Sequence, residues 1–88
     1  VFYATGQPGA VNVAPGAGSV MVGFSPAGDV TSGRLYNTSC RFVSEVVLTG
    51  NADGNVVWTI LHSGAPRVVT VQSPLSNGQW AIVVKLLA

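Results

Sequence analysis

Apolar residues recur along this chain in short runs, and several runs alternate regularly with other side chains. In residues 56–62, one set of alternate positions holds Val56, Trp58 and Ile60. A period of two residues is typical of a β-strand, because successive side chains point to opposite faces of a sheet. The pattern therefore predicts strands, and it makes Trp58 a core residue.

Glycine and proline separate these runs. The 11 glycines and 5 prolines leave no piece long enough for an ordinary helix. The strands that we expect are residues 1–4, 10–13, 19–24, 41–49, 56–62, 67–72 and 79–87, with a further short strand near 33–36 in an irregular stretch from 30 to 40. Turns and loops are expected between them, at 5–9, 14–18, 25–29, 50–55, 63–66 and 73–78.

The spacing of the runs predicts the fold class. Short connections favour antiparallel pairing, since parallel strands need long crossovers. Short strands at intervals of roughly 8–12 residues are typical of sandwiches and jelly rolls. We expect a single all-β domain over residues 1–88, a small antiparallel β-sandwich or jelly-roll-like module of six to seven strands.

The length of the chain raises the question of what stabilises it. A domain of 88 residues buries only about two-thirds of its unfolded surface. Small domains are commonly stabilised by disulfides, by a metal or by oligomerisation. Cys40 is the only cysteine and His62 the only histidine, so no intrachain disulfide forms and a zinc site of four Cys or His ligands is not expected. Oligomerisation remains.

Composition favours the same conclusion. Charged residues make up 8% of the chain and hydrophobic residues 48%, whereas about a quarter of an ordinary soluble domain is charged. One interpretation is a neutral monomer covered by small polar residues. We favour the other, in which apolar surface contacts sister chains.

The same numbers bear on other partners. A net charge of +1 with scattered basic residues disfavours nucleic-acid binding, which needs a clustered basic face. No apolar run approaches the ~18 residues of a membrane span, so membrane insertion is not expected. No signal peptide is visible, and a first residue Val1 in place of Met predicts a processed product or a fragment of a longer chain.

The last predicted strand, residues 79–87, is apolar on both faces. One face carries Trp80, Ile82, Val84 and Leu86, and Trp80 is expected in the core. A sandwich strand has only one face on the core, so its other apolar face needs another cover. We predict that the interface with sister chains is formed by Ala81, Val83, Lys85 and Leu87. The alternatives are a closed barrel, or a cap made by residues 30–40.

No catalytic residue, metal site or cofactor is predicted. His62 could be combined with an aspartate and a serine, but no nucleophile elbow is present. The acidic residues are not expected to converge as a catalytic pair. Residues 51–55 resemble the start of a calcium loop, but its twelfth position holds His62 and not glutamate. Turns capped by Asn and Asp side chains explain these residues without a metal.

A surface glycan is the ligand for which the sequence offers candidate residues. Sugar recognition uses an aromatic platform together with amide and guanidinium groups, and loops on a rigid scaffold often carry binding sites. The candidates are Arg34, Tyr36, Asn37, Asn51 and Asp53. Residues 37–39 also match the N-glycosylation pattern, which we interpret as a chance match. Cys40 is expected to be a small buried residue and not a reactive thiol.

Three features occur together: low charge with abundant Ala, Gly, Val, Ser and Asn, turns such as TGQPG and APGAG, and a closing apolar strand, WAIVVKLLA. In these features the whole chain resembles the distal C-terminal β-modules of bacteriophage tail spikes and fibres. The resemblance is compositional, so it carries over no functional residue. It implies a trimer of β-sandwiches that acts in trimerisation or in attachment to the host surface.

We therefore expect a non-enzymatic structural module of a virion, a homotrimer on the virion surface or otherwise extracellular, whose ligand is a host-surface glycan. Two alternatives remain open. One is a monomeric carbohydrate-binding module of a secreted protein, and the other is a protruding or decoration domain of a viral capsid.

Overall fold

Eight strands and one 3-10 turn form the part of the chain that the computed structural model describes, residues 1–26, 34–35, 41–52 and 54–87. The elements are β1 (Phe2–Ala4), β2 (Asn12–Gly16), β3 (Ser19–Phe24), β4 (Arg34–Leu35), β5 (Val43–Ala52), β6 (Asn55–His62), β7 (Arg67–Pro74), η1 (Ser76–Gly78) and β8 (Trp80–Leu87). Every strand pairing is antiparallel. The all-β prediction is confirmed.

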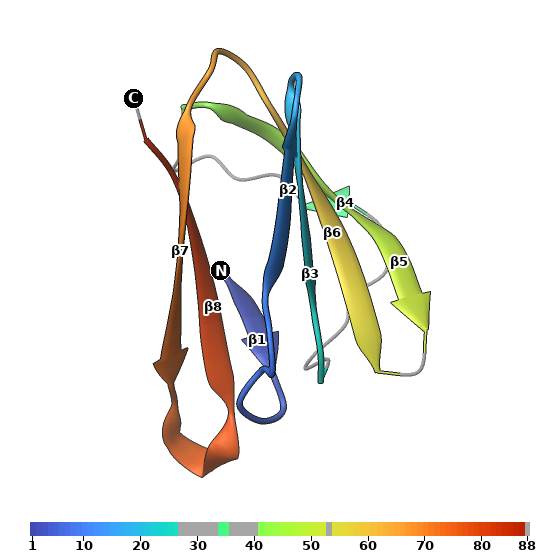
Figure 1. Ribbon diagram of the computed structural model, residues 1–88, viewed down its shortest axis with the longest axis vertical. Helices are drawn as coiled ribbons and strands as arrows, with labels where there is room; N and C mark the ends of the chain where they lie inside the picture. The colour runs from blue at the N-terminus through green and yellow to red at the C-terminus, as the bar shows by residue number, and fades with distance from the viewer. Residues whose placement is uncertain (27–33, 36–40, 53, 88) are drawn as a thin grey trace.

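The strands form two sheets that face each other (Figure 1). One sheet has three strands in the order β1-β8-β7, and the other has five in the order β2-β3-β6-β5-β4. The protein is thus a small β-sandwich, as predicted. None of the described residues belongs to a helix that is long and apolar enough to cross a membrane.

The core lies between the two sheets. Its buried members are Phe2, Ala4, Val20, Val22, Phe24, Val46, Val56, Trp58, Ile60, Ile82 and Leu86. The ring of Phe2, in β1, stacks on that of Trp58, in β6, with centroids 5.3 Å apart, and lies 6.0 Å from the ring of Phe24. These aromatic contacts join the three-stranded sheet to the five-stranded one. Trp80 packs against the same core and is partly buried.

The alternation predicted for β6 is confirmed, since Val56, Trp58 and Ile60 are all buried. Alternate residues from Phe42 to Leu48 are apolar except at Ser44, and the structure shows why. The register between β5 and β6 shifts between Val43 and Glu45 and again between Leu48 and Gly50. Ser44 and Thr49 are therefore the extra residues of two β-bulges.

The hydroxyl groups of both bulge residues bond to the neighbouring strand. Ser44 Oγ donates to the carbonyl of Leu61 at 3.1 Å, and Thr49 Oγ1 donates to the carbonyl of Val57 at 3.2 Å. A polar residue is thus suited to each bulge, and its presence breaks the apolar pattern.

Two predicted boundaries are wrong. The second strand was expected at residues 10–13 with a turn at 14–18, but β2 continues to Gly16 and only Ala17 and Gly18 turn into β3. Pro15 lies within β2, which is an edge strand of its sheet, the place in a sheet where proline is tolerated. The loop expected at 50–55 is also wrong, because β5 and β6 take up most of it and leave only residues 53–54 between them.

Most of the irregular stretch from 30 to 40 lies outside the described residues, and so does Cys40. The short strand expected near 33–36 is present as β4, which pairs with Val46 and Val47 of β5.

The turn between β7 and β8 allows a test of the positive φ angles that the structure shows there. Its turn closes with a bond from the Leu75 amide to the Gln79 carbonyl at 2.7 Å, and Asn77 and Gly78 have φ of 61° and 80°. We expect Gly78→Ala to lower the free energy of unfolding by about 1–2 kcal/mol, because L side chains disfavour positive φ. Urea denaturation followed by tryptophan fluorescence measures it.

The matched control is Gly9→Ala, since a Cβ at Gly9 meets no atom within 4 Å and φ there is outside the left-handed region. We expect little change. An equal loss for both variants would contradict the assignment of the turn.

A second test concerns the core. Ile82 is 0% exposed, and Ile82→Ala is expected to lower the free energy of unfolding by about 2–5 kcal/mol through lost burial and the cavity that remains. Leu75→Ala, at an exposed turn residue, is the control and should cost under about 1 kcal/mol. Thermal denaturation followed by circular dichroism ranks the two, and similar melting temperatures would contradict the burial of Ile82.

Candidate functional site

The outer side of the three-stranded sheet carries a face that is mostly apolar. Residues opposite each other in an antiparallel pair share a face, and the pairs here are Tyr3 with Ala81, Val71 with Val83, Val69 with Lys85, and Arg67 with Leu87. Their sequence neighbours Phe2, Ile82 and Leu86 are buried in the core, so these side chains point away from it. We call this set of residues the apolar sheet face.

Large apolar side chains are exposed on all three strands of this face. Tyr3 is 46% exposed, Val71 45% and Leu87 37%. Single exposed apolar residues are normal in proteins, whereas a contiguous group often marks an interaction surface.

The four residues predicted as an interface, Ala81, Val83, Lys85 and Leu87, all lie on the apolar sheet face. Ala81 adds little surface, since it is only 7% exposed between Tyr3 and Ser73 on the neighbouring strands. Val83 is partly buried, and Lys85 is exposed.

The sequence analysis missed Tyr3, Val69 and Val71 as members of this face. The alternation in residues 1–4 and 67–72 held the necessary signal for each strand. Four consecutive β-branched residues from Val68 to Val71, however, concealed which face of that strand was buried.

One end of the face is cationic. Lys85 is opposite Val69, and Arg67 lies two residues before Val69 on the same strand, so the two exposed cations are diagonal neighbours. Glu45 is the acidic residue in the part of the chain that the structure describes, and it lies in the other sheet. The face therefore combines a mostly apolar end with a positively charged end.

Partial burial lowers the pKa of the Val1 α-amino group, because desolvation disfavours its charged form. This group directly precedes β1. Its positive charge is therefore disfavoured relative to that of a fully hydrated amine.

The outer side of the five-stranded sheet is more mixed. Met21 and Leu61 are exposed there, but they lie among polar side chains, including Thr49 and Thr59, whose hydroxyl oxygens are 3.0 Å apart. It is therefore a weaker candidate for an apolar interface.

The structure places only part of the predicted glycan site. Tyr36, Asn37 and Asp53 lie outside the described residues. Arg34 is opposite Val47 of β5, and Asn51 is exposed four residues further along β5, a separation of about 13 Å along the strand. Arg34 and Asn51 are therefore not brought together at one point.

In the described ranges, no group of three His, Cys, Asp or Glu residues is placed to hold a metal ion.

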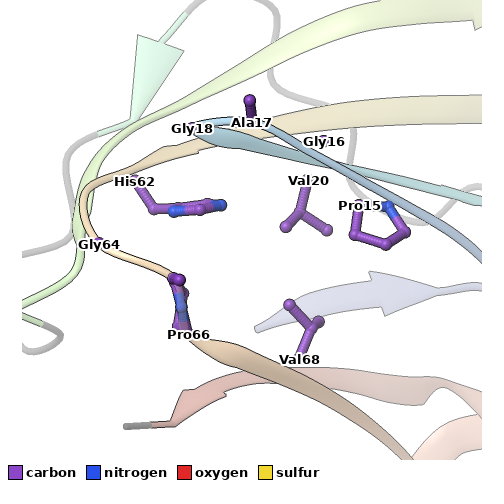
Figure 2. A pocket seen from close by; sticks show the side chains of 10 residues that line it. Pro15, Gly16, Ala17, Gly18, Val20, His62, Gly64, Pro66 and Val68 are labelled. Atoms are coloured by element: carbon purple, nitrogen blue, oxygen red, sulfur yellow. The ribbon is translucent and has the colours of Figure 1, made fainter.

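A cavity of about 430 Å³ lies between the two sheets at one end of the sandwich. Figure 2 shows it between the β2–β3 hairpin and the loop that leads from β6 to β7. Its lining consists of Pro15, Gly16, Ala17, Gly18, Val20, His62, Gly64, Ala65, Pro66 and Val68. His62 is the last residue of β6, and its imidazole extends into this cavity (Figure 2).

Backbone hydrogen bonds fix the rim of the cavity. The His62 amide donates to the Gly18 carbonyl at 3.0 Å, and the Ser63 amide donates to the Phe42 carbonyl at 2.9 Å. The first bond connects the β2–β3 hairpin to the end of β6, and the second connects the start of the β6–β7 loop to the residue that precedes β5.

Comparisons with protein-family models, with curated proteins and with solved structures found no match to this chain.

Proposed function

We propose that this chain is a non-enzymatic structural module that forms a homotrimer through the apolar sheet face. The observation that carries the proposal is the exposure of Tyr3 and Val71 on the two strands that flank β8, beside its residues Ala81 and Val83. Covering these side chains with equivalent ones from sister chains removes apolar surface from water, which favours association.

The size of the domain supports this proposal. One cysteine excludes an intrachain disulfide, and the described residues hold no metal cluster. Association is the remaining common means by which so small a domain gains stability.

The charges indicate how the copies would meet. The end with Tyr3, Val71 and Val83 is turned toward the common axis. Lys85 and Arg67 lie at the rim, where their long side chains keep the charged groups in water. Burying these like charges against each other would oppose association.

The dimensions of the face predict the strength of the assembly. The strands are about 4.8 Å apart, and β7 and β8 have eight residues each whereas β1 has three, which gives a face of roughly 300 Å². A standard interface buries about 800 Å² per partner. The proposed trimer therefore depends on protein concentration.

The virion setting of the proposal is supported by the compositional resemblance to phage tail spikes and fibres. Attachment to a surface glycan is the second part of this role, with Arg34, Tyr36, Asn37, Asn51 and Asp53 as contacts.

The test is the oligomeric state across protein concentration. Analytical ultracentrifugation of the wild-type chain should show a species of three 9.0 kDa chains, ~27 kDa, that grows with concentration. Val71→Lys should shift the population to the monomer, because it replaces an exposed apolar side chain with a charge that must be desolvated.

Leu75→Lys is the matched control, since Leu75 is similarly exposed but lies in the turn between β7 and β8. Circular dichroism verifies that both variants are folded. A wild-type chain that stays monomeric at the highest concentration would contradict the proposal, and so would equal effects of the two substitutions.

The proposed position of Lys85 at the rim leads to a separate prediction. Lys85→Gln should strengthen the trimer, because it removes repulsion between equivalent charges on the three copies. Added salt should act in the same direction on the wild-type chain and less on the variant. Sedimentation at several salt concentrations measures both effects.

Arg41→Gln is the control, because Arg41 lies outside the three-stranded sheet, 5.0 Å from the centre of the Phe42 ring. Dissociation of the wild-type trimer by salt would instead indicate that Lys85 contacts an acidic partner group, and the proposed rim position would be wrong.

A further inference from the structure

We propose that the cavity between the β2–β3 hairpin and the β6–β7 loop binds an uncharged phenol-type ring. The site is independent of the proposed trimer, because it lies between the sheets of one chain and not on the apolar sheet face.

The walls of the cavity are apolar and come from both sheets. Val20 of β3 and Val68 of β7 lie on opposite sides of it, and Pro15 and Pro66 contribute ring surfaces (Figure 2). Ligand sites of this kind are lined mainly by apolar groups, with a few polar groups that fix the orientation of the ligand.

Backbone geometry keeps the cavity open. Gly18 and Gly64 have φ of 75° and 70°, a conformation that strongly favours glycine. The residues next to these glycines, Ala17 and Ala65, contribute only small side chains to the lining.

The size of the cavity sets a limit on the ligand. An engineered apolar cavity of about 150 Å³ in another protein holds a benzene molecule. At about 430 Å³, this cavity has room for one substituted ring or two fused rings, but not for an extended chain.

The chemistry of the lining selects the class of ligand. Among the described residues that form it, His62 supplies the one polar side chain, and the others are Pro, Gly, Ala and Val. A charged ligand would find no charge partner in this lining. A sugar would leave most of its hydroxyl groups without a partner, which is unfavourable in an apolar site. An aromatic ring with a single hydroxyl group matches the lining.

The contact made by His62 indicates how that hydroxyl would be held. Its Nδ1 lies 3.4 Å from the carbonyl oxygen of Ser63, a long contact in which Nδ1 is the donor. In the tautomer that carries the proton on Nδ1, this contact is a hydrogen bond and Nε2 is an acceptor. The imidazole points from the end of β6 toward Val20 (Figure 2), so a phenol O–H in the cavity would donate to Nε2.

Site rigidity also favours binding. The rim is held by the His62–Gly18 and Ser63–Phe42 backbone bonds, and two prolines restrict the adjacent backbone. A preformed site loses little conformational freedom when a ligand enters.

The test is a titration followed by amide chemical shifts in ¹H–¹⁵N NMR spectra of the folded chain. The probe is p-cresol, and toluene, 4-methylbenzoate and methyl glucoside are the matched comparisons. We expect p-cresol to bind with saturable shifts confined to residues around the cavity, such as Gly18, Val20 and His62. Toluene should bind about fivefold more weakly, corresponding to the loss of one hydrogen bond. The anion and the sugar should cause no saturable shift.

Two variants distinguish the contribution of the His62 acceptor from that of the space in the cavity. His62→Leu removes the acceptor, so p-cresol binding should weaken about fivefold while toluene binding stays unchanged. Val68→Phe adds bulk at a partly buried wall residue, so both ligands should lose binding. Val71→Phe, on the opposite face of the same strand, is the control and should leave both affinities unchanged.

The outcomes decide the proposal. Equal affinities for toluene and p-cresol would overturn the role of His62 and with it the phenol class. Shifts spread over the apolar sheet face, or none at the cavity, would overturn the site. N-acetyl-tyrosinamide then distinguishes the two sources of a phenol. Its binding would indicate a tyrosine side chain of a partner, and its exclusion would indicate a free small molecule.

Discussion

Burial of Ile82 and Leu86 in the core determines where the remaining side chains of β8 point. The side-chain period of a strand is two residues, so fixing one set inward fixes the alternate set outward. Val83, Lys85 and Leu87 are therefore directed away from the core. The register then aligns Tyr3, Val69 and Val71 with them on the neighbouring strands. The apolar sheet face is thus a consequence of the same burial that stabilises the sandwich.

Because burial of one set of β8 side chains directs the other set outward, this small domain has apolar residues on an outer face as well as in its core. The buried core consists of aliphatic side chains, valine the most frequent, together with three aromatic residues, and the stacking of Phe2 on Trp58 joins the layers. Apolar residues on the opposite face of β8 add nothing to this core. In a chain of 88 residues with 48% hydrophobic content, the outer face of the three-stranded sheet offers roughly 300 Å² for contact with other molecules. That area is small for a stable interface, which is why charge at its rim strongly affects the proposed assembly.

Sequence alone identified the strands whose pattern has one buried face. Residues 19–24 are β3 as predicted, and β6 follows the alternation of Val56, Trp58 and Ile60. The errors arise where local signals compete with pairing. Pro15 indicated a turn, yet at a sheet edge its missing amide costs no ladder bond. Ser44 interrupts the alternation of β5 because it is a bulge residue. The residue pattern of one strand cannot predict a register shift, because the shift depends on the strand with which it pairs.

The candidate sites differ in how much of each could be predicted from the sequence. The outward set of β8 was predictable, because alternation within one strand was sufficient. Its partners Tyr3 and Val71 required the strand order β1-β8-β7, which depends on contacts between distant parts of the chain. The cavity was beyond sequence analysis for the same reason. It lies where the turn after β2 and the loop after β6 come together, next to the bond from the His62 amide to the Gly18 carbonyl.

The strand β7 connects these two features while keeping them chemically separate. Val68 faces the interior and lines the cavity, whereas Val69 and Val71 belong to the outer face. Adjacent residues on one strand thus serve two surfaces with different requirements. The cavity needs a fixed volume next to one polar group, and the outer face needs apolar area with its charge at the rim. Because the pleat holds these sets on opposite sides of the sheet, a substitution at Val71 alters one surface without filling the other.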